Sequence, residues 1–278
     1  MTTDTTAHLP IGVFDSGVGG LTVLRALRRA LPAEDFLYLG DTARLPYGTK
    51  SGATVARYAL QTTRVLVDIG VKLLVVACNT ASSVALPGLN QAYPGLPVTG
   101  VIEPGAAAAC EAAPRGRIAV IATGGTVRGA AYQAAILRRL PEATIATRSA
   151  QLFVSLAEEG WIDGAIVTDI ARRYLDPLMA EFPDTGPDCL VLGCTHFPVL
   201  AQAIREVLPA GVCCIDSAET TAQCVADELA ARGLLRPRGN GAGTVKFFAT
   251  DDPERFARVG EIFLGEPLSA ADVTLVDL

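Results

Sequence analysis

Two cysteines stand in matching positions in this sequence. Cys78 follows the apolar run Leu73–Ala77 and opens a polar segment, and Cys194 does the same after Cys189–Gly193. Each layout predicts a strand that leads into a helix, with the thiol at the N-terminus of the helix. Free backbone amides and the helix dipole there stabilise a thiolate or a bound carboxylate. One such cysteine is usually a small core residue, so it is the repetition that indicates chemistry.

Two thiols that face one ligand can invert a stereocentre. One thiol removes a proton from one face of a carbon atom, and the other delivers a proton to the opposite face. The unperturbed thiol pKa of about 8.5 is close enough to neutrality for one thiolate and one thiol to coexist. A pyridoxal-type racemase would need a Schiff-base lysine, and Lys50, Lys72 and Lys246, the lysines of this chain, stand in no such setting. We therefore expect proton transfer without a cofactor.

Two further ionisable residues follow apolar runs. His196 lies two positions after Cys194, where its imidazole would tune the thiol, relay its proton or serve only as a core hydrogen-bonding group. Asp15 follows Ile11–Phe14 and precedes a glycine-rich turn. In that position a carboxylate can hydrogen-bond a substrate ammonium, accept a proton or cap a helix. The turn has Thr22 where a dinucleotide motif needs glycine, and it lacks the ending of a phosphate-binding loop, so nucleotide binding is not expected.

Polar segments also follow other predicted strands. Gly40–Gly48 is a long turn of the kind that rims a binding site, although an ordinary surface turn has the same pattern. Thr123 and Thr126 follow the run Arg117–Ala122. Hydroxyl and amide groups that converge on one cleft suit a small ligand that carries carboxylates.

Composition excludes several classes of protein. The chain has 278 residues, a net charge of −6 and scattered arginines, which does not match a nucleic-acid-binding surface. No apolar stretch reaches the roughly 18 residues of a membrane span, and the polar first ten residues do not resemble a secretory signal. Seven cysteines without C-x-x-C spacing indicate reduced thiols, and two histidines leave few ligands for a metal. We expect a cytoplasmic protein without a metal site.

Apolar runs alternate with helical patterns along the whole chain. Alternation of this kind predicts an α/β protein with parallel sheets, and the best break in the first half is Tyr93–Pro97. We therefore expect two Rossmann-like parallel-sheet lobes with a cleft between them. Ligands bind beyond the carboxyl ends of parallel strands, so both thiols face one cleft if each belongs to a different lobe. The predicted strands are 11–14, 36–39, 73–77, 98–102, 117–122, 143–147, 189–193, 212–215 and 245–250.

Several ordered segments carry a family resemblance. The chain resembles the bacterial glutamate racemases, of the aspartate/glutamate racemase superfamily, over nearly its whole length from about Ile11. The matching segments are Phe14–Val23, Gly40–Gly48, Ala77–Ser82, Gly100–Gly105, Leu192–His196 and Thr250–Phe256.

This resemblance implies a cofactor-independent interconversion of L- and D-glutamate that supplies D-glutamate for peptidoglycan. It implies that Cys78 takes the proton from D-glutamate and Cys194 takes it from L-glutamate. It further implies a first lobe of residues 10–99 plus 214–278, a second lobe of residues 100–213, and a homodimer without nucleic-acid or membrane partners.

The resemblance also assigns the remaining site residues. Asp15, His196 and Glu158 match the groups that assist the thiols, with Glu159 as the alternative to Glu158. The matching substrate contacts are Asp15, Ser16, Tyr47, Gly48, Asn79, Thr80, Thr195 and His196, to which the hydroxyls of Thr123 and Thr126 are added.

Three segments depart from the family pattern. Phe197 replaces the usual tyrosine, Ser149–Gln151 replaces a Cys-Pro element, and Gly124–Gly125 interrupts a Thr-Arg-x-Thr pattern. The alternatives to a glutamate racemase are a racemase of aspartate or another acidic amino acid, a non-catalytic amino-acid-binding module, and a thiol redox protein. The absence of C-x-x-C disfavours the last of these, and the presence of both thiols disfavours the binding module.

Overall fold

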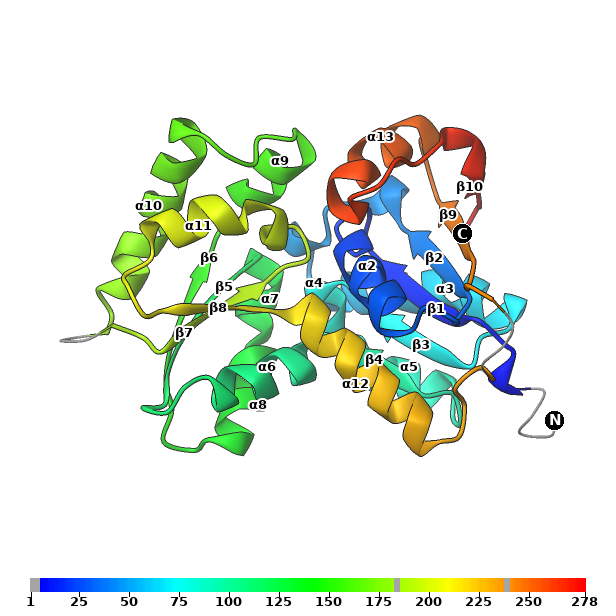
Figure 1. Cartoon of the computed structure of the whole chain (residues 1–278), viewed down its shortest axis with the longest axis horizontal. Coiled ribbons are helices and arrows are strands. Elements are labelled where there is room, and N and C mark those ends of the chain that lie inside the picture. Colours follow the sequence, from blue (N-terminus) through cyan, green and yellow to red (C-terminus); the bar gives the residue numbers. More distant parts are fainter. Residues whose placement is uncertain (1–5, 183–185, 238–240) are drawn as a thin grey trace.

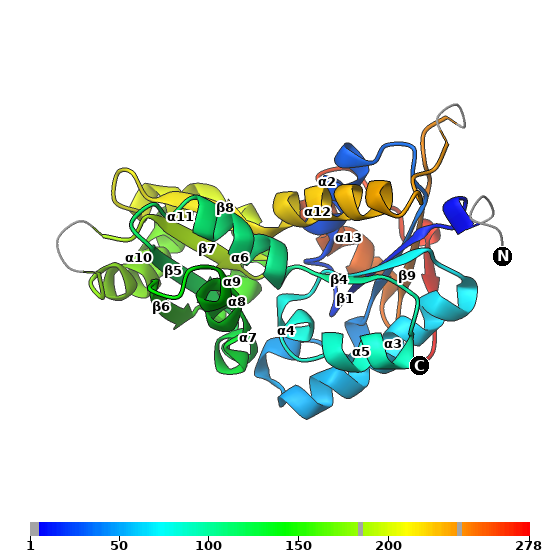
Figure 2. The same ribbon diagram turned by 90° about the horizontal axis from the view of Figure 1, so that it is seen from below.

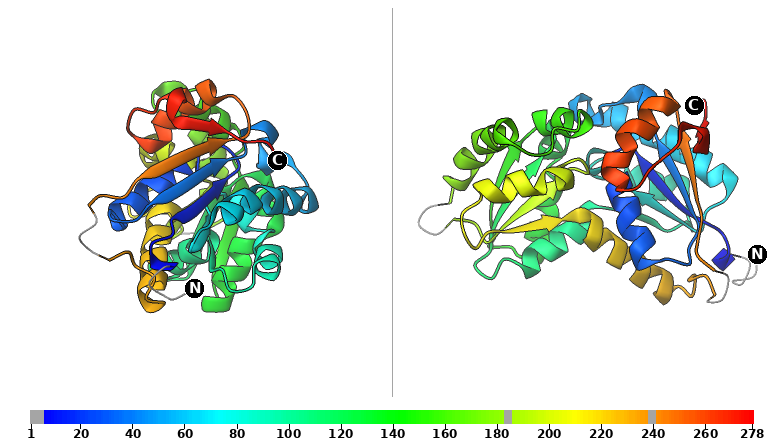
Figure 3. Two further views of the ribbon diagram at one scale, coloured as in Figure 1. Left: turned by 90° about the vertical axis from the view of Figure 1, so that its right-hand side faces the viewer. Right: turned by 45° about the horizontal axis from the view of Figure 1, so that its top comes forward.

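The computed structural model describes residues 6–182, 186–237 and 241–278. These residues form two α/β lobes, each built around one parallel sheet (Figure 1). The predicted fold class is therefore confirmed. Both lobes lie side by side in the right-hand view of Figure 3, with the strands of each sheet running toward the region between them.

The first lobe contains a six-stranded sheet in the order β10-β9-β2-β1-β3-β4. Every neighbouring pair is parallel. Its central strands are buried on both faces, which explains why they read as continuous apolar runs. The strands are β1 (Ile11–Asp15), β2 (Phe36–Gly40), β3 (Leu73–Val76), β4 (Val98–Gly100), β9 (Val245–Ala249) and β10 (Val273–Leu275).

The second lobe contains a four-stranded parallel sheet in the order β6-β5-β7-β8. Cys189 packs in the core on one face of this sheet, whereas Cys194 belongs to the core on the other face, as expected from their separation. The strands are β5 (Arg117–Ala122), β6 (Thr144–Ser149), β7 (Cys189–Gly193) and β8 (Cys213–Asp216).

Helices cover the sheets and connect their strands. In the first lobe these are α2 (Leu21–Ala30), α3 (Gly52–Ile69), α4 (Asn79–Ser82), α5 (Leu86–Ala92), α12 (Ser217–Ala231) and α13 (Pro253–Leu264). In the second lobe they are α6 (Ile102–Glu111), α7 (Gly124–Gly129), α8 (Ala131–Arg139), α9 (Leu152–Glu158), α10 (Ala165–Met179) and α11 (Ala201–Val207). Short 3-10 turns add η1 (Thr42–Arg44), η2 (Tyr47–Thr49), η3 (Phe197–Leu200) and η4 (Ala270–Asp272). None of the described helices is both long enough and apolar enough to cross a bilayer.

The chain crosses between the sheets twice. It leaves the first sheet after Gly100, and it returns through α12, which runs alongside α2 (Figure 2). The sheet memberships differ slightly from the sequence-based division at 100 and 213. Gly100 still pairs in the first sheet, and residues 214–216 of β8 pair in the second.

All nine predicted strands exist, but the segment after Val98 was predicted wrongly. The strand ends at Gly100, and Ile102 already begins the alanine-rich helix α6, because a short apolar run does not distinguish a strand from a buried helix. The helix expected after Cys78 is also divided into α4 and α5. Pro87 in the first turn of α5 provides the reason, because proline cannot continue a preceding helix.

Candidate active site

Cys78 lies where β3 ends and α4 begins. Its Sγ is the N-cap of α4 and accepts a hydrogen bond from the backbone N–H of Ala81 at 3.4 Å. The side chain is buried. Burial, reinforced by the negative charge of Asp15, raises the pKa of the Cys78 thiol to about 12. Cys78 is therefore a protonated thiol, and so a proton donor, at neutral pH.

Cys194 lies directly after β7 and has a different set of neighbours. Its Sγ is 3.7 Å from Nδ1 of His196, whose Nε2 is 3.1 Å from Oε1 of Glu158. The other carboxylate oxygen of Glu158 accepts a hydrogen bond from Arg255 at 2.8 Å. A thiol, an imidazole, a carboxylate and a guanidinium thus form one continuous chain.

The imidazole of His196 also carries a positive charge, beside that of the Arg255 guanidinium. Burial disfavours a charged imidazole, but the hydrogen bonds and charges of Cys194 and Glu158 outweigh burial and raise the pKa of His196 to about 10. Burial likewise opposes a charged Glu158, but His196 and Arg255 outweigh it and hold the pKa of that carboxyl below its usual range. The protonated imidazole of His196 thus places a positive charge beside Sγ of Cys194.

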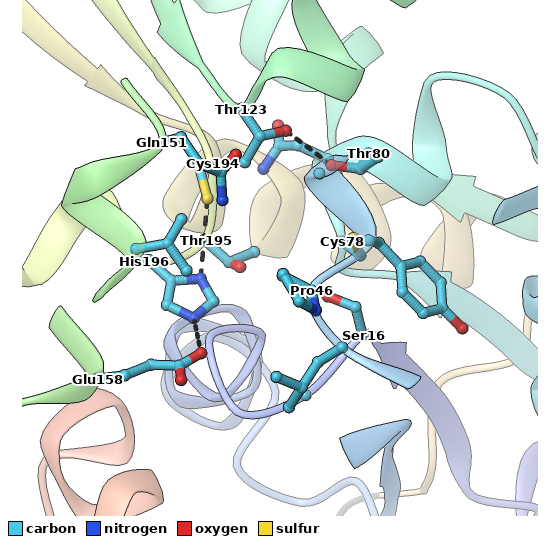
Figure 4. A pocket seen from close by; sticks show the side chains of 16 residues that line it. Ser16, Pro46, Cys78, Thr80, Thr123, Gln151, Glu158, Cys194, Thr195 and His196 are labelled. Atoms are coloured by element: carbon cyan, nitrogen blue, oxygen red, sulfur yellow. Dashed lines mark hydrogen bonds and ion pairs between the residues drawn. The ribbon is translucent and has the colours of Figure 1, made fainter. Parts of the chain in front are cut away.

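Both thiols line one cavity of about 420 Å³ between the lobes. Figure 4 shows Cys194, His196 and Glu158 along one side, with Cys78 and Ser16 across from them. The expectation that the two matching strand ends face each other is met, because β3 and β7 point into this cavity from opposite lobes. Residues of both lobes form its wall.

Asp15 lies behind the cavity wall. It is fully buried at the end of β1, and its Oδ2 accepts a hydrogen bond from the backbone of Gly17 at 3.0 Å. The other oxygen, Oδ1, has no hydrogen-bond partner among the described residues. Burial raises the pKa of Asp15, and the positive charge of His196 offsets part of this rise. Its charge also acts on Cys78, so the carboxylate influences both halves of the site.

Three threonine hydroxyls join the two lobes beside the cavity. Oγ1 of Thr80, from α4, is 2.8 Å from Oγ1 of Thr123 and 3.3 Å from Oγ1 of Thr126. Thr80 and Thr123 line the cavity, whereas Thr126 supports them from behind. Thr195 also lines the cavity, and its carbonyl accepts a hydrogen bond from Thr22 at 3.2 Å.

Asn79 offers a free donor. Its Oδ1 accepts a hydrogen bond from the hydroxyl of Tyr132, of the second lobe, at 2.8 Å. Its Nδ2 is buried and has no partner in the part of the chain that the structure describes. A buried amide N–H without a partner is costly, so a carboxylate ligand in the cavity would satisfy it.

Tyr47 and Gly48 contribute to the cavity in different ways. The Tyr47 hydroxyl donates to Asp41, so it is already occupied within the first lobe. Gly48 lies against the opposite lobe, where a Cβ atom would be 2.7 Å from Cβ of Thr123. Only glycine fits this close approach between the lobes.

Leu45 and Pro46 line the cavity, as expected for the Gly40–Gly48 turn, whereas the lining residues Gln151 and Val154 were not predicted from the sequence. Gln151 belongs to a segment noted only as a departure from the family pattern, and Arg255 lies in a matching segment to which no role was given. Glu159 is exposed, whereas Glu158 faces the cavity.

The sequence and its structure match one family of enzymes. A family model described as Asp/Glu/Hydantoin racemase matches residues 11–225. The chain belongs to this family. Within it, a glutamate racemase of Geobacter metallireducens is 51% identical over 268 residues, which is 96% of each protein.

Solved structures of family members extend the similarity to three dimensions. The glutamate racemase of Thermus thermophilus, in complex with beta-chloro-D-alanine, is 46% identical, with a TM-score of 0.85 and 98% of each chain covered. The glutamate racemase of Francisella tularensis, in complex with D-glutamate, is 36% identical, with a TM-score of 0.88 and the same coverage. The family resemblance inferred from the sequence is confirmed.

Proposed function

We propose that Cys78 and Cys194 exchange the α-proton of glutamate from opposite faces, and that the protein thereby acts as a glutamate racemase. The observation that carries this proposal is the placement of both thiols on one cavity between the lobes. The activity is that of an isomerase, it needs no cofactor, and the D-glutamate serves peptidoglycan synthesis.

In the direction from L-glutamate, the Cys194 thiolate takes the α-proton and becomes a thiol. The C–H electron pair stays on the substrate as a carbanion, and the Cys78 thiol gives its proton to the opposite face and becomes a thiolate. In the direction from D-glutamate, the two thiols exchange roles. The raised pKa of Cys78 supports its role as the proton donor in this direction, and His196 supplies a positive charge next to the sulfur of Cys194.

Other groups bind the substrate and stabilise charge. The developing negative charge spreads onto the α-carboxylate of the substrate, where fixed hydrogen-bond donors stabilise it most. The unpaired Asn79 amide, the cavity hydroxyls of Thr80, Thr123 and Thr195, and the backbone around Ser16 and Gly48 suit the two carboxylates. Asp15, which lies behind the cavity wall, acts on the site through its charge. His196 and Glu158 assist Cys194.

The test is proton exchange during turnover. Purified protein and L-glutamate in deuterated buffer are expected to give D-glutamate with deuterium at the α-carbon, measured by chiral chromatography and mass spectrometry. D-glutamate that keeps its original hydrogen would contradict a two-base mechanism. Faster racemisation of aspartate than of glutamate would contradict the choice of substrate.

Three further expectations accompany this function. The lobe boundaries that we propose are about residues 100 and 216, where the chain changes sheets. A cytoplasmic location suits a mechanism that needs two reduced thiols. A homodimer is expected from the family resemblance, and light scattering after size-exclusion chromatography tests it, with a monomeric mass as the contrary result.

A further inference from the structure

Arg255 is a first-lobe residue that reaches a second-lobe carboxylate. It lies in the first turn of α13, where its backbone N–H donates to the N-cap Asp252 at 3.0 Å. Helix α13 packs on α2 of the first lobe. The guanidinium Nη2 lies 2.8 Å from Oε2 of Glu158, at the end of α9 in the second lobe.

Glu158 has one oxygen for each neighbour. Oε1 contacts His196 inside the substrate cavity, and Oε2 contacts Arg255. The Glu158 side chain also lines a second cavity of about 400 Å³, whose wall includes Arg255, Asp251 and Asp252. The carboxylate therefore stands in the wall between the two cavities, and Arg255 holds it from the outer side.

Among the charged residues around it, the Arg255 guanidinium forms its ion pair with Glu158. The described structure contains no ion pair from the Arg255 side chain to Asp251 or Asp252, although both line the same second cavity. On the inner side the charged group facing Glu158 is His196, from the segment after β7. Without Arg255, Glu158 would be free to turn toward solvent and away from the imidazole.

We propose that Arg255 is a positioning residue for the Cys194 half of the site, which holds Glu158 against His196 across the gap between the lobes. The proposal rests on the proposed function, because it assigns Arg255 to the group that assists Cys194. It makes the position of His196 beside Cys194 depend on how closely the two lobes approach each other. When the lobes separate, Arg255 and Glu158 separate, and His196 loses the carboxylate that orients and charges it.

The exposed fraction of the Arg255 side chain sets the expected size of the effect on kcat. The Arg255 side chain is 45% exposed, so solvent screens the pair. We expect Arg255→Gln to lower kcat for L-glutamate about fivefold, with a smaller change in KM. Arg255→Lys should recover part of this loss, because it keeps the charge but lacks the fixed geometry of the guanidinium. Arg258→Gln is the matched control, because Arg258 is exposed on the same helix and has no ion pair in the described structure.

The imidazole of His196 supplies an independent readout. The chain has only two histidines, so a His8→Gln background leaves a single imidazole signal in the NMR spectrum. Loss of Arg255 is expected to lower the pKa of His196 from about 10 toward its ordinary value of 6.5, because Glu158 moves away. Arg258→Gln is expected to leave this pKa unchanged. A rise in the pKa would overturn the proposal, because it would show that Arg255 acts only as a nearby positive charge.

The kinetic outcomes also separate the two proposals. Wild-type kcat in Arg255→Gln, an equal loss in Arg255→Gln and Arg258→Gln, or a rise in KM alone would each overturn the positioning role. A wild-type protein that does not racemise glutamate would overturn the proposed function instead. Circular dichroism of each variant establishes that it is folded before its kinetics are compared.

Discussion

At the scale of single residues, the two cysteines are chemically unequal although their sequence settings match. Cys78 is buried and lies near the negative charge of Asp15, whereas Cys194 faces an imidazolium held by Glu158. The two sulfurs therefore lie in different electrostatic environments. This inequality does not bias the product, because the equilibrium constant between mirror-image amino acids is 1.

Replacement of either thiol by alanine is expected to abolish racemisation in both directions. Cys78→Ala and Cys194→Ala each remove the proton-transfer group for one face, a loss of about 10³-fold or more in kcat/KM. The loss must be equal in both directions, since the equilibrium constant fixes the ratio of the two kcat/KM values. Polarimetry measures the rate, and Cys224→Ala, on α12 outside the cavity, is the control. Appreciable racemisation by either variant would count against the mechanism.

The raised pKa of His196 predicts a pH-dependent stability. The folded pKa of about 10 exceeds the ordinary 6.5, so the native state binds the extra proton between these values. The resulting stabilisation is complete below pH 6.5 and is lost as the pH rises toward 10, with a slope of at most about 1.4 kcal/mol per pH unit. Urea unfolding of wild type and His196→Asn at pH 7, 8 and 9 measures it. The stability difference between the two proteins should shrink as the pH rises, and a constant difference would contradict the assignment.

At the scale of elements, loops at the carboxyl ends of the strands bring the site together. The turn η2 of the first lobe contacts α7 of the second, and a Cβ atom on Gly48 would clash with Thr123 at the N-cap of α7. The Thr80–Thr123 hydrogen bond lies beside it. Substrate binding therefore depends on how closely these two short elements approach.

Gly48→Ala is expected to keep the lobes apart. The new Cβ would be 2.7 Å from Cβ of Thr123 and 3.0 Å from Oε1 of Gln151, so the loop must move away from the cavity. We expect KM for glutamate to rise roughly tenfold or more, because small displacements of binding groups are costly. Gly88→Ala is the control, since nothing lies within 4 Å of its Cβ position in α5. Steady-state kinetics measure KM for both variants. An unchanged KM in Gly48→Ala would contradict the prediction, because it would show that the loop tolerates the methyl group.

At the scale of the whole molecule, one apolar core extends through both lobes. It contains Val13 and Val75 of the first sheet and Val120 and Val191 of the second. Each sheet also has a separate core on its other face. The shared core joins the lobes on the side of α2 and α12, and the polar cavity lies at the strand ends between them.

A buried ion pair stabilises the first lobe at the opposite end of its strands. The ammonium of Lys72 is inaccessible and donates to Glu34 and to the carbonyl of Ala7. Lys72→Met is expected to lower the free energy of unfolding by about 3 to 5 kcal/mol, because it leaves the buried Glu34 carboxylate without its cation. Urea unfolding measures this, with Lys50→Met as the control, because the Lys50 ammonium makes an exposed hydrogen bond to the carbonyl of Pro46. Racemisation at saturating substrate should be unchanged at low temperature, and a loss of activity in the folded variant would contradict a purely structural role.

The sequence by itself determined the chemistry and the kind of fold. Continuous apolar runs must be buried on both faces, so the order of strands and helices predicted parallel sheets, and the matching ends at Cys78 and Cys194 predicted a pair of thiols. Asp15 and His196 were found from their positions after apolar runs, and Glu158 was found through the resemblance. Each of these signals lies within a short segment, where spacing along the chain is sufficient.

Only the tertiary structure decided which groups meet across the lobes. Arg255 and Glu158 are 97 positions apart, and Gly48 meets Thr123 and Gln151 from another lobe. The pKa values of Cys78 and His196 likewise depend on burial and on charges from distant segments. Local spacing carries no information about such contacts, because they arise from how two separately packed sheets face each other.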